Sequence, residues 1–238
     1  YKRQVPTLSG AIAAWGLTKF GAGTVRFSGN LSTLRGNLTV QSGAVQFGTG
    51  AAQPASVNLV LNDAGTIDLN GGLVEVGSLA GTAGIITNSA GTAGTLVMVG
   101  ANNTTFNGTF QNGQTGSVSV IKGGNATLTL DDASNANPFS NVNTQAGFTL
   151  RSGQINLNTP TGLGDNASTL TLQGGTLNLN MTGVGPGLPM VVGTRGATTG
   201  GMSVVVNGTG TSIVTDNNGV FNTGFTDVYF QFGNLTLG

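Results

Sequence analysis

The chain has 238 residues, of which 42 are glycine, 34 threonine and 25 asparagine. Only 7% are charged, far below the quarter that is usual in soluble domains, and the eight basic and eight acidic side chains cancel. The sequence holds neither cysteine nor histidine, which excludes disulfides, thiol chemistry and the usual zinc sites.

Two further classes are excluded by how residues are distributed. Nucleic-acid binding needs clustered cations that replace counterions, but the basic residues are scattered. They are Lys2, Arg3, Lys19, Arg26, Arg35, Lys122, Arg151 and Arg195. No stretch approaches the roughly 18 apolar residues of a membrane helix, so we expect no transmembrane segment.

Residues 1–16 resemble a secretory signal peptide only faintly. Two basic residues precede a tail of small residues, but Pro6 and Gly10 interrupt the apolar run that such a peptide needs. We therefore assign no signal peptide here.

From residue 17 onward, apolar and polar residues alternate with a period of two, which is typical of β-strands with one buried face. Expected strands lie within 23–29, 37–41, 44–48, 56–62, 65–71, 126–131, 147–153, 154–158, 168–175 and 175–180. Glycine, asparagine, serine or aspartate separates them, and no segment has a sustained helical period. We expect almost no helix.

The alternation also predicts which side chains point inward. In the first half these are Val25, Phe27, Leu38, Val40, Val45, Phe47, Leu59, Ile67 and Leu69. In the second half they are Leu128, Leu130, Phe148, Leu150, Ile155, Leu157, Leu172, Leu177 and Leu179. Asp68, between two inward positions, is expected to point outward.

A degenerate repeat of about 110 residues relates residues 17–70 to residues 120–180. The stretch "LTKFGAGTVRFSGN" corresponds to "VIKGGNATLTLDDA", which aligns Lys19 with Lys122. "GNLTVQSGAVQF" corresponds to "GFTLRSGQINL", which aligns Gly43 with Gly153. A period this long spans several strands, so it is a super-repeat of strands and turns.

Short strands at even spacing fit either a parallel β-solenoid or an antiparallel sandwich. The solenoid is favoured because small polar outward residues stack well on like residues one rung away, whereas stacked like charges would repel. Rungs of about 20–25 residues predict about ten coils. In a sandwich, "QSGAV" would instead be a tight hairpin turn.

The quoted segments, together with "GTLVMVGANNTTFNGTFQNGQTGSVSVIKGGNATLTL" at residues 94–130, resemble the autotransporter-associated β-strand repeat. That motif is often written L-x-K-x-G-x-G-T-L-x-L-S-G-x-N. The resemblance implies an all-β chain folded as a right-handed, single-stranded parallel β-helix, and a place outside the cell or on a bacterial surface. We expect residues 1–238 to be one continuous segment of a longer β-helix.

Parallel β-helices also include polysaccharide lyases and hydrolases, so an enzyme that acts on polysaccharide is the alternative. Inverting hydrolysis needs two carboxylates roughly 6.5–9.5 Å apart. The acids are Asp63, Asp68, Glu75, Asp131, Asp132, Asp165, Asp216 and Asp227. Both the Asp63–Asp68 and the Asp131–Asp132 pair contain turn residues, so we predict no catalytic residues.

Other candidate sites are also better explained by structure. "DNNG" at residues 216–219 lacks the bidentate glutamate of a calcium loop, and the glycine-rich residues 81–94 lack the lysine and helix of a phosphate loop. We predict no metal, no cofactor and no glycosylation at the Asn-x-Ser/Thr sequons. Trp15 is expected to pack in the core or at a coil end, with an exposed sugar-stacking role as the alternative.

These observations predict a structural segment of a surface or extracellular β-solenoid: a fibre, stalk or adhesin without enzymatic activity. Its partners would be further copies of itself, assembled into a filament, or a surface glycan. Neither end of the sequence has the polar cap of natural solenoids, so we expect the chain to continue or copies to stack end to end.

Overall fold

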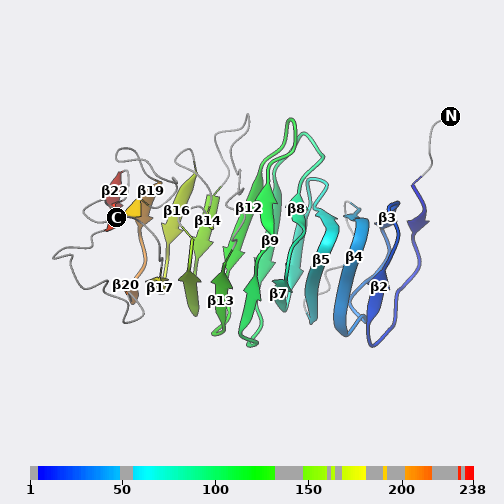
Figure 1. The fold of residues 1–238 in the computed structure, drawn as a ribbon, viewed down its shortest axis with the longest axis horizontal. Coiled ribbons are helices and arrows are strands. Elements are labelled where there is room, and N and C mark those ends of the chain that lie inside the picture. Colours follow the sequence, from blue (N-terminus) through cyan, green and yellow to red (C-terminus); the bar gives the residue numbers. More distant parts are fainter. Residues whose placement is uncertain are drawn as a thin grey trace.

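The structure is a computed structural model that describes residues 5–48, 56–131, 147–159, 162–163, 168–180, 190–191, 202–215, 230–231 and 234–238. Over these residues the protein is all-β and contains no helix. Strands stack side by side from the N-terminal to the C-terminal end and form a rod (Figure 1). The predicted fold class, a parallel β-helix, is confirmed.

The larger sheet runs the length of the rod. Its strands are β1 (Thr7–Leu8), β2 (Leu17–Lys19), β3 (Thr24–Phe27), β4 (Gly36–Phe47), β5 (Val57–Asp68), β7 (Ser78–Gly81), β8 (Ile85–Thr87), β10 (Thr104–Phe106), β11 (Thr109–Gln111), β13 (Thr127–Leu130), β15 (Gln154–Leu157), β17 (Gly175–Leu179) and β20 (Thr211–Thr215).

A second sheet of seven strands lies on the other side of the coil. Its strands are β6 (Leu73–Val76), β9 (Gly94–Met98), β12 (Val118–Lys122), β14 (Gly147–Leu150), β16 (Thr169–Leu172), β19 (Ser203–Val206) and β22 (Leu235–Leu237). The short strands β18 (Met190–Val191) and β21 (Phe230–Gln231) pair with each other.

Every strand pair among the described residues is parallel, which excludes the antiparallel sandwich. The rung length follows from the register: Thr24 pairs with Ala44, 20 positions later, and Gln154 with Thr176, 22 positions later. It reaches 36 positions between Gly175 and Thr211.

The rod has about seven turns, fewer than the ten that were predicted. Ten strands follow one another along the larger sheet, but only seven form the second sheet. In the first turns the opposite side is formed by segments that are not strands. There, the Ile12 amide donates to the Asn30 carbonyl (2.9 Å), and the Arg35 amide donates to the Ala14 carbonyl (2.8 Å).

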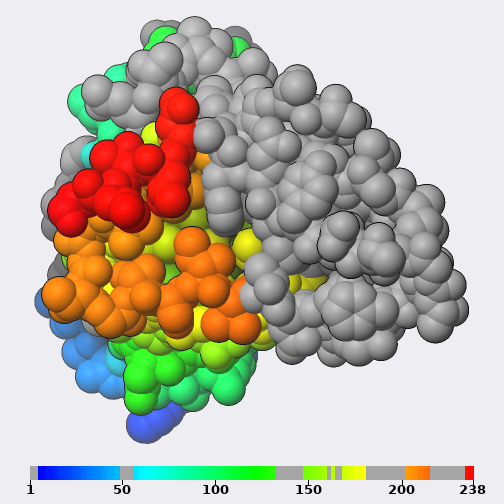
Figure 2. Space-filling model, turned by 90° about the vertical axis from the view of Figure 1, so that its left-hand side faces the viewer, coloured from blue at the N-terminus to red at the C-terminus, as the bar shows by residue number. Residues whose placement is uncertain are grey.

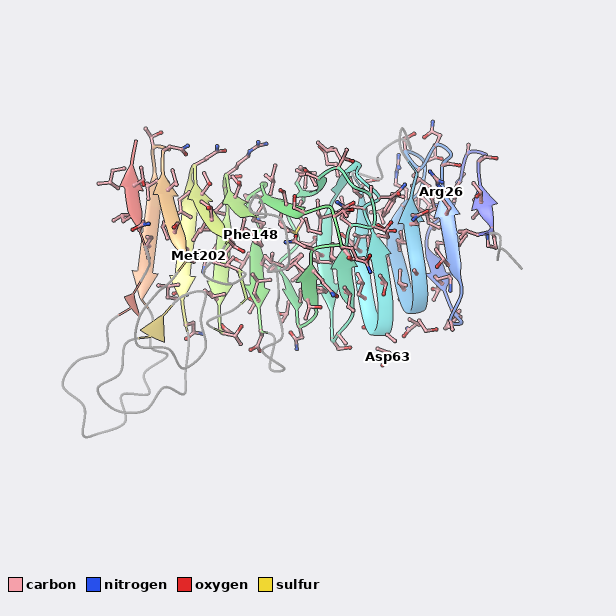
Figure 3. All side chains as sticks on the ribbon, turned by 90° about the horizontal axis from the view of Figure 1, so that it is seen from above. Arg26, Asp63, Phe148 and Met202 are labelled. Carbon is pink, nitrogen blue, oxygen red and sulfur yellow. The ribbon has the colours of Figure 1, made fainter. Side chains whose placement is uncertain are left out.

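The predicted inward residues form the core between the two sheets. All eighteen are buried except Val25, which is half-buried and packs against the others. Stacking places like residues one above another: Leu38 on Leu59, and Ile155 on Leu177. Figure 3 shows Phe148 among the side chains of the coil interior. Each rung buries its apolar face only against its neighbours, as expected for a solenoid.

β4 and β5 are long bent strands, although the sequence predicted two short strands in place of each. β4 bends at the "QSG" segment, where its pairing with β5 shifts register between Val40 and Ser42. Asp63 has a left-handed backbone (φ 48°) at the matching bend of β5. The bend therefore turns a corner of the coil, and no hairpin forms at "QSGAV".

Figure 2 views the rod from its C-terminal end, where β19 and β20 are coloured orange and β22 red. In this end rung, Leu235 and Leu237 of β22 are exposed.

Candidate functional site

The first candidate, the Asp63–Asp68 carboxylate pair, does not form a hydrolytic site. Asp63 is exposed at the bend of β5, at the edge of the rod in Figure 3, and Asp68 ends the same strand. The four residue steps of extended chain from Ala64 to Asp68 span on the order of 13 Å. This exceeds the separation that inverting hydrolysis needs.

Asp68 alternates with the inward residues Ile67 and Leu69, as predicted, but it is not solvent-exposed. The residue is only 7% exposed, and its carboxylate is bound by Gln46 from the previous rung and Ser89 from the next. Oδ1 accepts hydrogen bonds from the backbone amides of Asn70 and Ser89, both at 2.9 Å. Oδ2 accepts from Gln46 Nε2 (2.8 Å) and Ser89 Oγ (2.6 Å). With four donors, Asp68 joins three rungs as a structural acceptor.

The remaining acids give no cluster in the described part of the chain. Asp131 follows β13 directly, as predicted for a residue that ends a strand. Asp132, Asp165, Asp216, Asp227 and the "DNNG" segment lie outside the described residues. Among the described residues, no three of the side chains that bind metals lie close enough to hold an ion.

Trp15 is exposed, contrary to the expectation that it packs in the core or at a coil end. Its side chain is 89% accessible, and Phe20, on the far side of β2, is 71% accessible. Trp15 lies between the strands, where the alternation that predicts burial does not apply.

The structure places two basic residues where the sequence did not predict them, on the inward face of the coil. Lys19 stacks on Val40, which itself stacks on Leu61. Lys122 stacks between Met98 and Leu150 and is only 3% exposed. The sequence held a signal for both, because each lysine is two positions after an apolar inward residue of the same strand.

The turn that follows each lysine is one residue longer than the turn at the same corner of the next rung. Lys19 pairs with Val40, 21 positions later, but Thr24 pairs with Ala44, only 20 positions later. Lys122 pairs with Leu150, 28 positions later, and Thr127 with Gln154, 27 positions later. In both copies, therefore, a four-residue turn lies over a three-residue turn.

The Lys19 ammonium group lies among the backbone carbonyls of these two turns. Nζ donates hydrogen bonds to Phe20 O (2.7 Å) and Gly21 O (2.6 Å) of its own turn. It also donates to Ser42 O (3.2 Å) of the following rung. These charge-assisted bonds compensate for the partial burial of the group.

The Lys122 ammonium group is more deeply buried and donates to Gly123 O (2.6 Å). Here a serine supplies the contact between rungs: Ser152 Oγ donates to Gly124 O (2.9 Å). Burial lowers the pKa of Lys122 below its ordinary value, because the charged form loses hydration. A small hollow beside the lysine is lined by residues that include Met98, Asn102 and Thr104.

A glycine in the shorter turn completes each arrangement. Gly43 (φ 68°) and Gly153 (φ 75°) both have left-handed backbones that favour glycine. A Cβ atom added at either position would lie 2.8 Å from the Nζ of Lys19 or Lys122 and would clash with carbonyls of the longer turn. The two glycines that the sequence places in register thus occupy equivalent positions.

Asn88 is a second polar residue that the sequence did not single out. It is completely buried where three turns meet. Its Nδ2 donates to Thr92 O (2.6 Å) and Ser117 O (2.9 Å), and its Oδ1 accepts from the Gly71 amide (2.7 Å). These bonds satisfy the buried amide and tie consecutive rungs together.

Comparisons with protein-family models, curated proteins and solved structures found no match to this chain. In the part of the chain that the structure describes, no helix has the length and apolar character needed to cross a bilayer.

Proposed function

We propose that the chain is a structural segment of a bacterial cell-surface or extracellular β-solenoid, acting as a fibre, stalk or adhesin rather than as an enzyme. The observation that carries this proposal is the unbroken parallel ladder of the larger sheet, in which ten strands follow one another along the rod. Backbone hydrogen bonds then run along the axis, and apolar columns fill the interior. Such a coil is a stiff spacer.

Membership of the autotransporter-associated β-strand repeat family is part of the proposal. It is supported by the lysine of the motif, which in both copies binds the carbonyl of the next residue and lies over a left-handed glycine of the following rung. A long solenoid of this kind would hold a terminal region away from the cell, and its nearly uncharged surface would permit packing against further copies or a glycan.

Labelling of intact cells tests the location. In the organism that makes the chain, an antibody raised against residues 1–238 should label unpermeabilised cells as strongly as permeabilised ones. A cytoplasmic marker serves as the control and should be labelled only after permeabilisation. Labelling that requires permeabilisation would contradict the proposal.

Single-molecule stretching tests the mechanical role. When the segment is pulled from its two ends, it should unfold in steps of one rung. A rung of 20–22 residues, as in the register of Thr24 with Ala44 and Gln154 with Thr176, releases roughly 70–80 Å of extended chain. Extension at negligible force, without steps, would argue against a stalk.

The absence of enzymatic activity is tested with polysaccharide substrates. Glycan release by the chain should not exceed that of the Asp63→Asn variant, which removes an exposed carboxylate at a left-handed bend that asparagine tolerates. Release that the wild-type chain performs and the variant loses would favour the enzyme alternative.

A further inference from the structure

The core alone does not fix how one rung aligns with the next. Because strand side chains alternate with a period of two, a shift of one rung by two residues keeps every apolar side chain inward. In the first copy such a shift would place Leu17 over Val40 rather than over Leu38. Val40 and Leu38 are both buried and aliphatic, so the core would tolerate either alignment. Another feature has to specify the register.

The packing of both lysines over the glycines of the next rung depends on register, and so does one hydrogen bond of Lys19. Lys19 Nζ reaches Ser42 O of the next rung only when Lys19 lies over Val40. The left-handed glycines allow the longer turn to approach closely in the same register, and a shifted rung would bring a residue with a Cβ atom beneath the ammonium group. Equivalent amide bonds follow in both copies: Ala44 N to Gly23 O and Gln154 N to Ala126 O, both 3.1 Å.

We propose that Lys19 with Gly43, and Lys122 with Gly153, are register locks that fix the alignment of consecutive rungs at two points along the coil. Each ammonium group binds carbonyl oxygens of its own four-residue turn and lies over the glycine of the next rung. The register-dependent bonds are Lys19 to Ser42 O in the first copy and Ser152 to Gly124 O in the second. The proposal concerns how the coil aligns its own rungs, so it stands or falls independently of the surface role proposed above.

An apolar residue would serve the core better than a lysine at these positions. Lys122 stacks between Met98 and Leu150, where methionine would continue the column without desolvating a charge. The pKa of Lys122, lowered by burial, shows that the charged group is penalised there. Conformational specificity is one documented role of a buried charge, and it is the role proposed here.

Disulfide trapping measures the register directly, because the native chain has no cysteine. Thr18 of β2 pairs with Thr39 of β4, so cysteines at these two positions should cross-link in the correct register. Cysteines at Thr18 and Asn37, or at Thr18 and Gln41, report shifts of two residues in either direction. The wild-type background should give the Thr18–Thr39 cross-link almost exclusively.

In the Lys19→Met background, we expect the shifted cross-links to increase about tenfold, because the free energy of a hydrogen bond to a charged group corresponds to such a ratio. The matched control is Leu17→Met, an apolar substitution in the same strand, which should leave the pattern unchanged. Shifted cross-links that remain at the wild-type level in Lys19→Met would overturn the proposal.

Chemical rescue separates a lock from a general loss of folding. In Lys19→Ala, propylammonium replaces the missing part of the side chain and should restore the Thr18–Thr39 cross-link. Tetramethylammonium at the same concentration cannot donate hydrogen bonds and should not. Equal effects of the two cations, or loss of all cross-links without rescue, would contradict a role in register.

The second copy provides an independent trial. Ile121 pairs with Thr149, so cysteines at these positions report the native register, and cysteines at Ile121 and Arg151 report a shift. Lys122→Met should raise the shifted cross-link, by a smaller factor than in the first copy because Ser152 also joins the two turns. If the shifted cross-links increased in neither copy, the proposal would be excluded.

Discussion

The two copies of the super-repeat build the same corner with different hydrogen bonds. In the first copy, half-buried Lys19 donates to three carbonyls, one of them on the next rung. In the second copy, Lys122 is buried and donates to its own turn, while Ser152 makes the bond between rungs. The shared elements are the longer turn and the left-handed glycine. Backbone geometry is therefore the constant part of the motif, and the donor is exchangeable.

The largest expected effect is the loss of stability when a buried core side chain is truncated, which compares core packing in the two copies. Phe47→Ala should lower the free energy of unfolding by about 3–5 kcal/mol, since Phe47 is 2% exposed and contacts Phe27 edge-on (centroids 6.3 Å apart). Leu157→Ala, at the equivalent position, should cost about 2–5 kcal/mol. Urea denaturation measures both, and a Phe47 variant as stable as wild type would refute the assigned core.

Substitution of the two glycines tests whether backbone geometry is the constant part. Gly43→Ala and Gly153→Ala should each cost about 2–4 kcal/mol, from the left-handed backbone and from the clash with carbonyls. Gly23→Ala is the matched control, because a Cβ atom there meets nothing within 4 Å. Thermal unfolding should rank both glycine variants well below this control, and similar values for all three would break the comparison.

Substitution of the lysines tests the difference between the copies. Lys19→Met should cost about 1.5–3 kcal/mol, since three carbonyls lose a charged donor. Lys122→Met should cost less than half as much, because removing a buried charge offsets the lost bond to Gly123. Denaturant titration at neutral pH measures the free energy of unfolding of both variants. A larger loss of stability for Lys122→Met than for Lys19→Met would contradict the expectation that the second copy depends less on its lysine.

The smallest expected effect is a pH dependence specific to the second copy. Because the pKa of Lys122 is lowered in the folded chain from 10.5, the unfolded chain binds a proton that the folded chain has already lost in the range between the two values. The free energy of unfolding should therefore rise with pH through this range and level off above 10.5. Lys122→Met should remove that rise, and an unchanged pH profile would show that another group causes it.

The sequence was sufficient to predict the core of the rod but not its corners. Alternation identifies buried residues such as Leu38 and Ile155 because every rung repeats the same inward and outward pattern. Burial of Asp68 depends on Gln46 and Ser89 from other rungs, which a period along the chain does not reveal. Lys19 and Lys122 were counted only among the scattered basic residues, although their positions in the alternation place them inward.

Exposure of Trp15 has a consequence for optical measurements on this protein. It is the only tryptophan of the chain and is 89% accessible in the folded coil. Its indole ring is already hydrated before unfolding, so its fluorescence emission should lie near that of free tryptophan and shift little in denaturant. Dissolved iodide or acrylamide should quench nearly all of the emission, and a loss of quenching would then report that a binding partner covers the first turns of the coil.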